Sequence, residues 1–151
     1  ASRLFQDVRE ARGLAYTIDA LCDQHADCGR ISVYAGSDPK DAAEVVKITN
    51  GIWADIAGNG PTTSELARAK AVAAAQFAMS AEAPAARAGS AAYELLTFDR
   101  LVSVEEVLGH IDNVTIADVR RIAAETLRNP GIASAVGPKA GLAAAEAFVS
   151  A

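Results

Sequence analysis

Apolar residues recur at helical spacing at the start of the chain and then change to an alternating pattern. One stripe, at spacings of three and four, is formed by Leu4, Phe5, Val8 and Ala11. Such a stripe predicts an amphipathic helix. Gly13 follows the stripe, where a glycine in the left-handed conformation can end a helix. Residues 14–23 then carry β-branched and aromatic side chains in rough alternation, so the helix should pass directly into a strand.

The strand pattern occurs twice more. Residues 23–27 are polar and predict a turn, and residues 30–35 (RISVYA) predict a second strand, so these two strands should pair as a hairpin. Residues 132–136 (IASAV), which lie between two proline and glycine breaks, predict a third strand. The sheet is therefore expected to be small.

Helix start signals divide the remainder of the chain. A hydroxyl residue with an acidic residue three positions later is typical of a helix N-terminus. Three such pairs are Thr62 with Glu65, Ser103 with Glu106, and Thr115 with Asp118. Pro39 and Pro84 mark two further starts, because proline suits the first helical turn. The expected helices cover residues 38–57, 62–79, 84–98, 103–111, 115–128 and the chain from about residue 140.

One of these helices carries an apolar face that we expect to be buried. The helix at 84–98 places Ala88, Ala92, Leu95 and Leu96 close to one face, which we expect to point inward.

The elements together predict an α+β fold in which helices pack on one small, largely antiparallel sheet. With 151 residues and 51% hydrophobic content, the chain can bury one ordinary core, so we expect a single domain over residues 1–151. Three strands are few for this many helices, so either upstream strands complete the sheet or another chain covers its exposed edge. Because the sequence lacks an initiator Met and begins inside a predicted helix, we expect a fragment without its leading strands.

Charge and composition argue against some classes of function. The net charge is −5 and the basic residues are scattered, whereas nucleic-acid binding usually requires a basic face. No segment is apolar for long enough to cross a bilayer. The two cysteines are too few for a disulfide framework and leave the compartment open, with the cytoplasm favoured over the periplasm.

Metal-ligating residues gather at the predicted turn. Cys22, His25 and Cys28 have the spacing of soft-metal ligands, so a zinc or copper site is conceivable there. The plainer interpretation is a polar turn with two thiols at the strand ends, which would pair only if geometry and compartment allow it. Neither HExxH nor HxxEH occurs in the chain, so these residues cannot build the centre of a metallohydrolase.

Arg9 and Tyr16 are the remaining candidates. Arg9 lies off the apolar stripe of the first helix, and Tyr16 begins the strand that follows, so a turn after Gly13 can bring both side chains to one surface. A guanidinium is a forked donor for a carbonyl or carboxylate, and a phenol can hydrogen-bond a charged intermediate. The alternative is an arginine that solvates a helix and a tyrosine that is half buried at a strand end.

The opening segment SRLFQDVREARGLAY resembles the start of the second half of the M16 (pitrilysin and mitochondrial-processing-peptidase-like) zinc metallopeptidases. The resemblance continues through residues 34–36, 65–70, 114–119 and 135–137, and so covers nearly the whole chain. Asp19 departs from it, because an apolar or hydroxyl residue is expected at that position.

This resemblance implies a role for the chain. It implies an α+β half-domain that closes with others around an unfolded peptide, with zinc held by HxxEH in an N-terminal half or a partner subunit. Arg9 would bind a substrate carbonyl, and Tyr16 would stabilise the tetrahedral oxyanion. This chain would bind no cofactor itself and would be inactive alone. A non-catalytic scaffold or partner subunit of the same family is the alternative, and homo-oligomerisation through the exposed edge is expected in either case.

Overall fold

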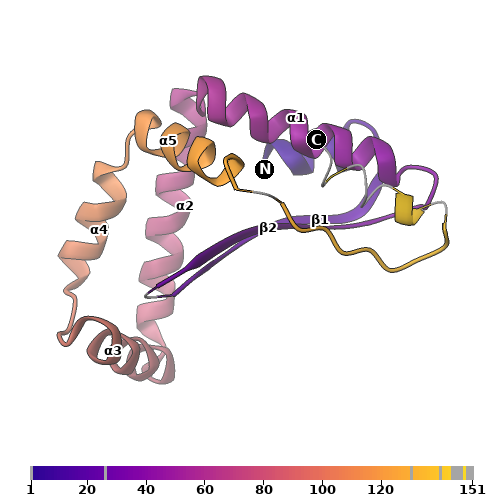
Figure 1. The fold of residues 1–151 in the computed structure, drawn as a ribbon. Helices are drawn as coiled ribbons and strands as arrows, with labels where there is room; N and C mark the ends of the chain where they lie inside the picture. Colours follow the sequence, from indigo (N-terminus) through magenta and orange to yellow (C-terminus); the bar gives the residue numbers. More distant parts are fainter. Residues whose placement is uncertain (1, 26, 130, 140, 144–147, 149–151) are drawn as a thin grey trace. The chain divides into compact units, whose positions relative to one another are not determined.

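The computed structural model describes residues 2–25, 27–129, 131–139, 141–143 and 148. The chain forms two compact units: unit 1, made of Ala1–Asn59 and Arg120–Ala151, and unit 2, made of Gly60–Val119. Unit 1 contains a short helix, a β-hairpin and a long helix, whereas unit 2 is helical (Figure 1). The helix-rich α+β class with one small antiparallel sheet is confirmed.

Unit 1 opens on a π-helix, η1 (Phe5–Glu10), where the sequence predicts an ordinary amphipathic helix. The wider turn is closed by the amide of Ala11, which donates to the carbonyl of Gln6 at 2.8 Å. Gly13 has a φ of +62°, so the predicted left-handed glycine is confirmed. The amide of Leu14 also donates back to the carbonyl of Val8 at 2.9 Å, which binds the start of the strand to the helix.

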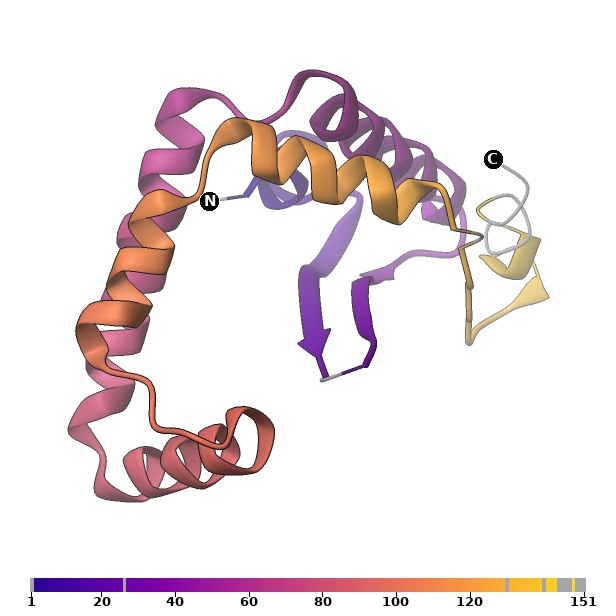
Figure 2. The same ribbon diagram turned by 60° about the vertical axis from the view of Figure 1, so that its left-hand side comes forward.

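The predicted hairpin is confirmed and is longer than expected. β1 (Ala15–Gln24) pairs antiparallel with β2 (Gly29–Ser37), and Figure 2 shows the two strands joined at the tip. α1 (Ala42–Asn59) follows the hairpin. Within the described residues the sheet has two strands. The prediction of a third strand at 132–136 is wrong, because these residues form neither helix nor strand. Ile132 is 94% exposed there, and no described strand pairs with the segment to hold it in the sheet.

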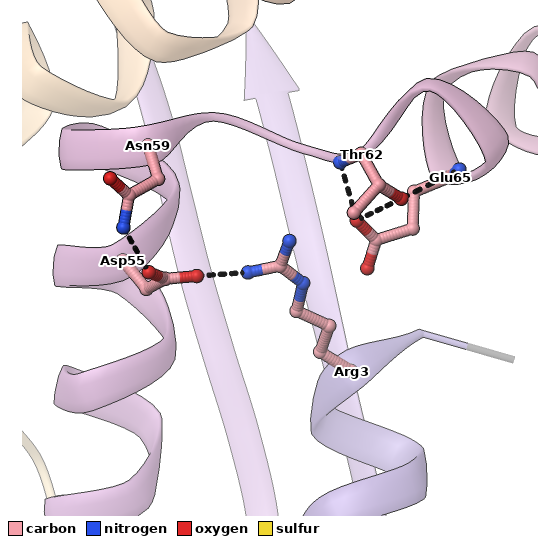
Figure 3. A network of polar contacts seen from close by, with 5 residues as sticks. All are labelled: Arg3, Asp55, Asn59, Thr62 and Glu65. Atoms are coloured by element: carbon pink, nitrogen blue, oxygen red, sulfur yellow. Dashed lines mark hydrogen bonds and ion pairs between the residues drawn. The ribbon is translucent and has the colours of Figure 1, made fainter.

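The core of unit 1 lies where the helix, the hairpin and α1 meet. It is made of the buried residues Val8, Ala15, Ile18 and Val45. Five half-buried residues surround them: Leu4, Leu14, Val33, Ala35 and Ile48. An ion pair adds to this packing, because the guanidinium of Arg3 lies 2.6 Å from the carboxylate of Asp55 (Figure 3). The core therefore holds η1 against both the hairpin and α1.

Unit 2 is built from three helices with the predicted starts. α2 (Thr63–Glu82) contacts both α3 (Pro84–Phe98) and α4 (Val104–Asn113). The capping box is complete at Thr62, whose hydroxyl accepts from the Glu65 amide while the Glu65 carboxylate accepts from the Thr62 amide (Figure 3). The acid–hydroxyl pair of Thr115 and Asp118 caps α5 (Ile116–Leu127) in the same way.

Two expectations for the helices are corrected. The predicted inward face of α3 is exposed, with Leu96 exposed to 88%, because neither α2 nor α4 covers it. At Ser103 only the hydroxyl half of the expected cap forms, since the Glu106 side chain is taken by Arg100. The expected closing helix from about residue 140 falls largely outside the described residues. Among the described helices, none combines the length and the apolar character that crossing a bilayer requires.

Candidate functional site

Arg9 lies in the π-helical turn and is exposed. Its guanidinium carbon stands 4.9 Å from the centroid of the Phe5 ring, a cation–π contact that orients the side chain along its own helix. The arginines on either side are engaged by acids, since Arg3 pairs with Asp55 and Arg12 lies 3.6 Å from Glu44. In the described part of the chain Arg9 has no acidic partner, so its forked donor is available to a ligand.

Tyr16 lies in a β-bulge. The strand register passes from Ala15 opposite Ser37 to Thr17 opposite Gly36, so Tyr16 is the extra residue that has no partner on β2. Its side chain is 77% exposed. Bulges occur often beside active sites, because the extra residue re-aims a side chain that regular alternation would direct elsewhere. The irregularity thus turns the phenol away from the core on which Ala15 and Ile18 pack.

The structure places Arg9 and Tyr16 on two elements that pack against each other. Val8, the neighbour of Arg9, and Ala15, the neighbour of Tyr16, belong to the same buried cluster. Each exposed candidate therefore has a buried chain neighbour, Val8 before Gly13 and Ala15 after it. No hydrogen bond joins the two candidates among the described residues, so a ligand can engage each of them separately.

The metal candidates lie at the tip of the hairpin. Cys22 and Cys28 are free and exposed. Cys22 stands opposite Ile31, so Cys28 is displaced by three residues, or about 10 Å along the strand at ~3.3 Å per residue, which exceeds the reach of a disulfide. In the described chain no three His, Cys, Asp or Glu side chains are arranged to hold a metal ion, and this includes Cys22, His25 and Cys28. The residues present therefore do not fit zinc.

A hollow between α3 and α4 brings together residues whose association the sequence did not predict. Arg100 donates to both carboxylate oxygens of Glu106, at 2.8 and 2.6 Å. The hydrogen bond from Arg100 is the main cause that lowers the pKa of Glu106 below its ordinary value. His110 and Tyr93 also line the hollow. The Arg100 guanidinium and the Glu106 carboxylate are therefore paired with each other, and the Glu94 carboxylate, which also lines the hollow, accepts a hydrogen bond from the amide of Val102. No spacing rule links positions 100 and 106 across a helix boundary, so no sequence signal could have found this pair.

A match in sequence shows to which class of protein domain this chain is similar. Residues 1–72, which include η1, the bulge and the whole hairpin, match the family described as "Peptidase M16 inactive domain". The match covers just under half of this chain, and that part is similar to the inactive, C-terminal type of M16 peptidase domain.

Similar proteins carry names that agree with this family. An uncharacterized zinc protease of Streptomyces coelicolor is 36% identical over 139 residues, which are 91% of this chain and 30% of that protein. An uncharacterized zinc protease of Mycobacterium tuberculosis is 33% identical over 138 residues, 91% of this chain and 32% of that protein. The chain thus spans about a third of the length of these relatives.

Solved structures share the fold. The peptidase M16 inactive domain from Pseudomonas fluorescens superposes with a TM-score of 0.69 at 23% identity, over 82% of this chain and 29% of that one. A chain of Complex III2 from Candida albicans gives a TM-score of 0.74 at 20% identity, over 83% of this chain and 30% of that one. The fold expected for an M16 half-domain is confirmed.

Proposed function

We propose that this chain is the substrate-binding C-terminal part of an M16-type zinc metalloendopeptidase, with residues 1–151 forming one M16-type domain. The observation that carries the proposal is the corner from η1 to β1. It falls inside the M16 match, and a π-turn and a β-bulge leave Arg9 and Tyr16 exposed above a shared core. Irregular backbone of these two kinds is frequent at functional sites.

Each side chain has a separate task in this proposal. Arg9 binds a backbone carbonyl of an extended peptide through its guanidinium, which carries two parallel donors and no acidic partner in the described chain. Tyr16 donates its phenolic hydrogen to the oxygen that becomes negative when the peptide carbonyl turns tetrahedral. Zinc is held by a second M16 domain or subunit, because the described residues of this chain supply no ligand set.

Replacement of Arg9 tests this proposal in the active assembly, meaning this chain together with a zinc-bearing M16 domain. Arg9→Gln should lower kcat/KM for a quenched fluorescent peptide about 10- to 150-fold, since a hydrogen bond from a charged donor is worth about 1.5–3 kcal/mol. Arg12→Gln is the matched control, because Arg12 lies in the same segment and faces Glu44 instead. Equal activity of the Arg9 and Arg12 variants would show that Arg9 does not contact the substrate.

A second candidate is a scaffold role in an inactive subunit of the same family. The similarity in fold to a chain of Complex III2 favours it. The scaffold role does not require an exposed arginine and tyrosine at the corner. Unchanged peptide hydrolysis in both the Arg9 and the Tyr16 variants would therefore favour the scaffold.

Self-association through the sheet edge is part of the same proposal. Within the described residues each strand of the hairpin pairs on one side only, so each has an outer edge of unpaired backbone donors and acceptors. Leu21 is 54% exposed and Ile31 is 37% exposed near the free tip. We expect light scattering to show dimers or larger species as the concentration of the isolated chain rises, by pairing of these edges. A constant monomer mass over a hundredfold range of concentration would contradict this.

A further inference from the structure

The outer face of the hairpin carries a second phenol near the bulge. Tyr34 stands opposite Asp19, and Gly36 stands opposite Thr17. Because successive side chains alternate between faces, these four residues lie on the face opposite to that of buried Ile18. Ala15 is buried together with Ile18, although three positions separate them, so the bulge leaves both Tyr16 and Thr17 off the core face. Tyr16 and Tyr34 therefore share the outer face.

The missing side chain of Gly36 leaves room between Tyr34 and the bulge. A Cβ atom at Gly36 would lie 3.2 Å from Cγ2 of Thr17 and 3.8 Å from the phenolic oxygen of Tyr34. The ring of Tyr34 thus leans over Gly36 toward Thr17, the chain neighbour of Tyr16. Tyr34 is 60% exposed and its hydroxyl makes no hydrogen bond within the described part of the chain. The Tyr34 hydroxyl is therefore directed toward the bulge, and no described residue hydrogen-bonds it.

We propose that the Tyr34 hydroxyl is a further substrate-binding group. It donates a hydrogen bond to a backbone carbonyl of the peptide that lies next to the carbonyl to which Tyr16 donates. Like-facing carbonyls of an extended peptide repeat about every 6.8 Å, two residues apart. Tyr34 and Tyr16 come from neighbouring strands, and Tyr34 lies two residues from Gly36, which stands opposite Thr17, the residue after Tyr16. The outer face therefore carries two phenols from neighbouring strands, and an extended peptide laid on it can present a like-facing carbonyl to each of them. This inference rests on the proposed function of Tyr16.

A structural role for Tyr34 makes a different prediction. An aromatic ring can stabilise a strand simply by covering a glycine on the neighbouring position. The ring of phenylalanine packs over Gly36 as well as that of tyrosine does, so Tyr34→Phe removes the hydroxyl and keeps the contact between the ring and Gly36. A loss of activity in this variant without a loss of stability can come only from the hydroxyl.

The test uses the active assembly and three single variants, Tyr34→Phe, Tyr16→Phe and Tyr93→Phe. Tyr34→Phe is expected to raise KM about two- to twelvefold with kcat nearly unchanged, because a neutral hydrogen bond to a ground-state carbonyl is worth about 0.5–1.5 kcal/mol. Tyr93→Phe is the matched control, since Tyr93 is similarly exposed but belongs to α3 of unit 2. Its KM should stay within twofold of the original.

The other outcomes separate this inference from the function on which it rests. Unchanged KM in Tyr34→Phe, with lower kcat in Tyr16→Phe, overturns the role of Tyr34 and leaves the proposed function intact. Unchanged kinetics in both variants overturns both. A higher KM in Tyr34→Phe that is accompanied by a lower urea midpoint assigns the effect to folding and also overturns the role of Tyr34.

Discussion

Replacing Tyr16 with phenylalanine is expected to lower kcat for peptide hydrolysis about 100-fold in the active assembly, since loss of one oxyanion donor costs about 10²–10³ in kcat. The effect should fall on kcat and on kcat/KM alike, with KM unchanged. An interaction made only in the transition state has this signature, whereas one made equally in the ground state alters KM. Initial rates with a quenched fluorescent peptide, measured over a range of substrate concentrations, separate the two constants.

The position of Tyr16 makes this result specific. Its side chain is 77% exposed and lies in the bulge, so the lost hydroxyl should leave the urea midpoint unchanged. Tyr93→Phe again serves as the control, because it removes a hydroxyl from the other unit. A Tyr16 variant that retains full kcat would show that the bulge has no catalytic purpose.

Replacing Val8 with alanine is expected to destabilise unit 1 by about 2–3 kcal/mol, a 30- to 150-fold change in the unfolding equilibrium constant. Val8 is the one fully buried side chain among the larger residues described, at 0% exposure. It packs with Ala15, Ile18 and Val45, which come from both neighbouring elements, so the lost methyl groups leave a cavity that none of them can fill alone. Urea unfolding followed by circular dichroism gives the change in midpoint.

Val72→Ala is the control for this prediction. Val72 lies in α2 and is 50% exposed, so the same chemical change removes little buried surface there. Alanine also has the higher helix propensity, and the midpoint should therefore be unchanged or slightly raised. Equal destabilisation by the two variants would mean that Val8 is not the centre of the core. Because Val8 adjoins Arg9 in the π-turn, the Val8 variant should also lose part of its activity in the assembly.

Features decided by near neighbours in the chain were predicted well. The hairpin, the left-handed Gly13 and the caps at Thr62 and Thr115 depend on residues no more than a few positions apart, or on strands joined by one turn. The free energy that selects them is local, so residue type and spacing suffice to predict it.

Features decided by distant packing were predicted poorly. The apolar stretch at 132–136 has the composition of a strand but, among the described residues, no neighbouring strand to pair with. Leu95 and Leu96 were expected to point inward, yet α3 meets no element that covers them. Composition shows that a segment can pair or pack, whereas only the tertiary structure shows whether a partner is in reach.

The corner from η1 to β1 shows the same division within one site. Sequence by itself determined that a helix ends at Gly13, that a strand follows, and that Arg9 and Tyr16 lie close to this junction. Only the tertiary structure decided that the helix widens into a π-turn, that Tyr16 lies in a bulge, and that Tyr34 leans over Gly36 on the same face. The physical reason is that register and helix width depend on how η1 and β2 pack against β1 around Val8, and residue spacing along one strand does not record that packing.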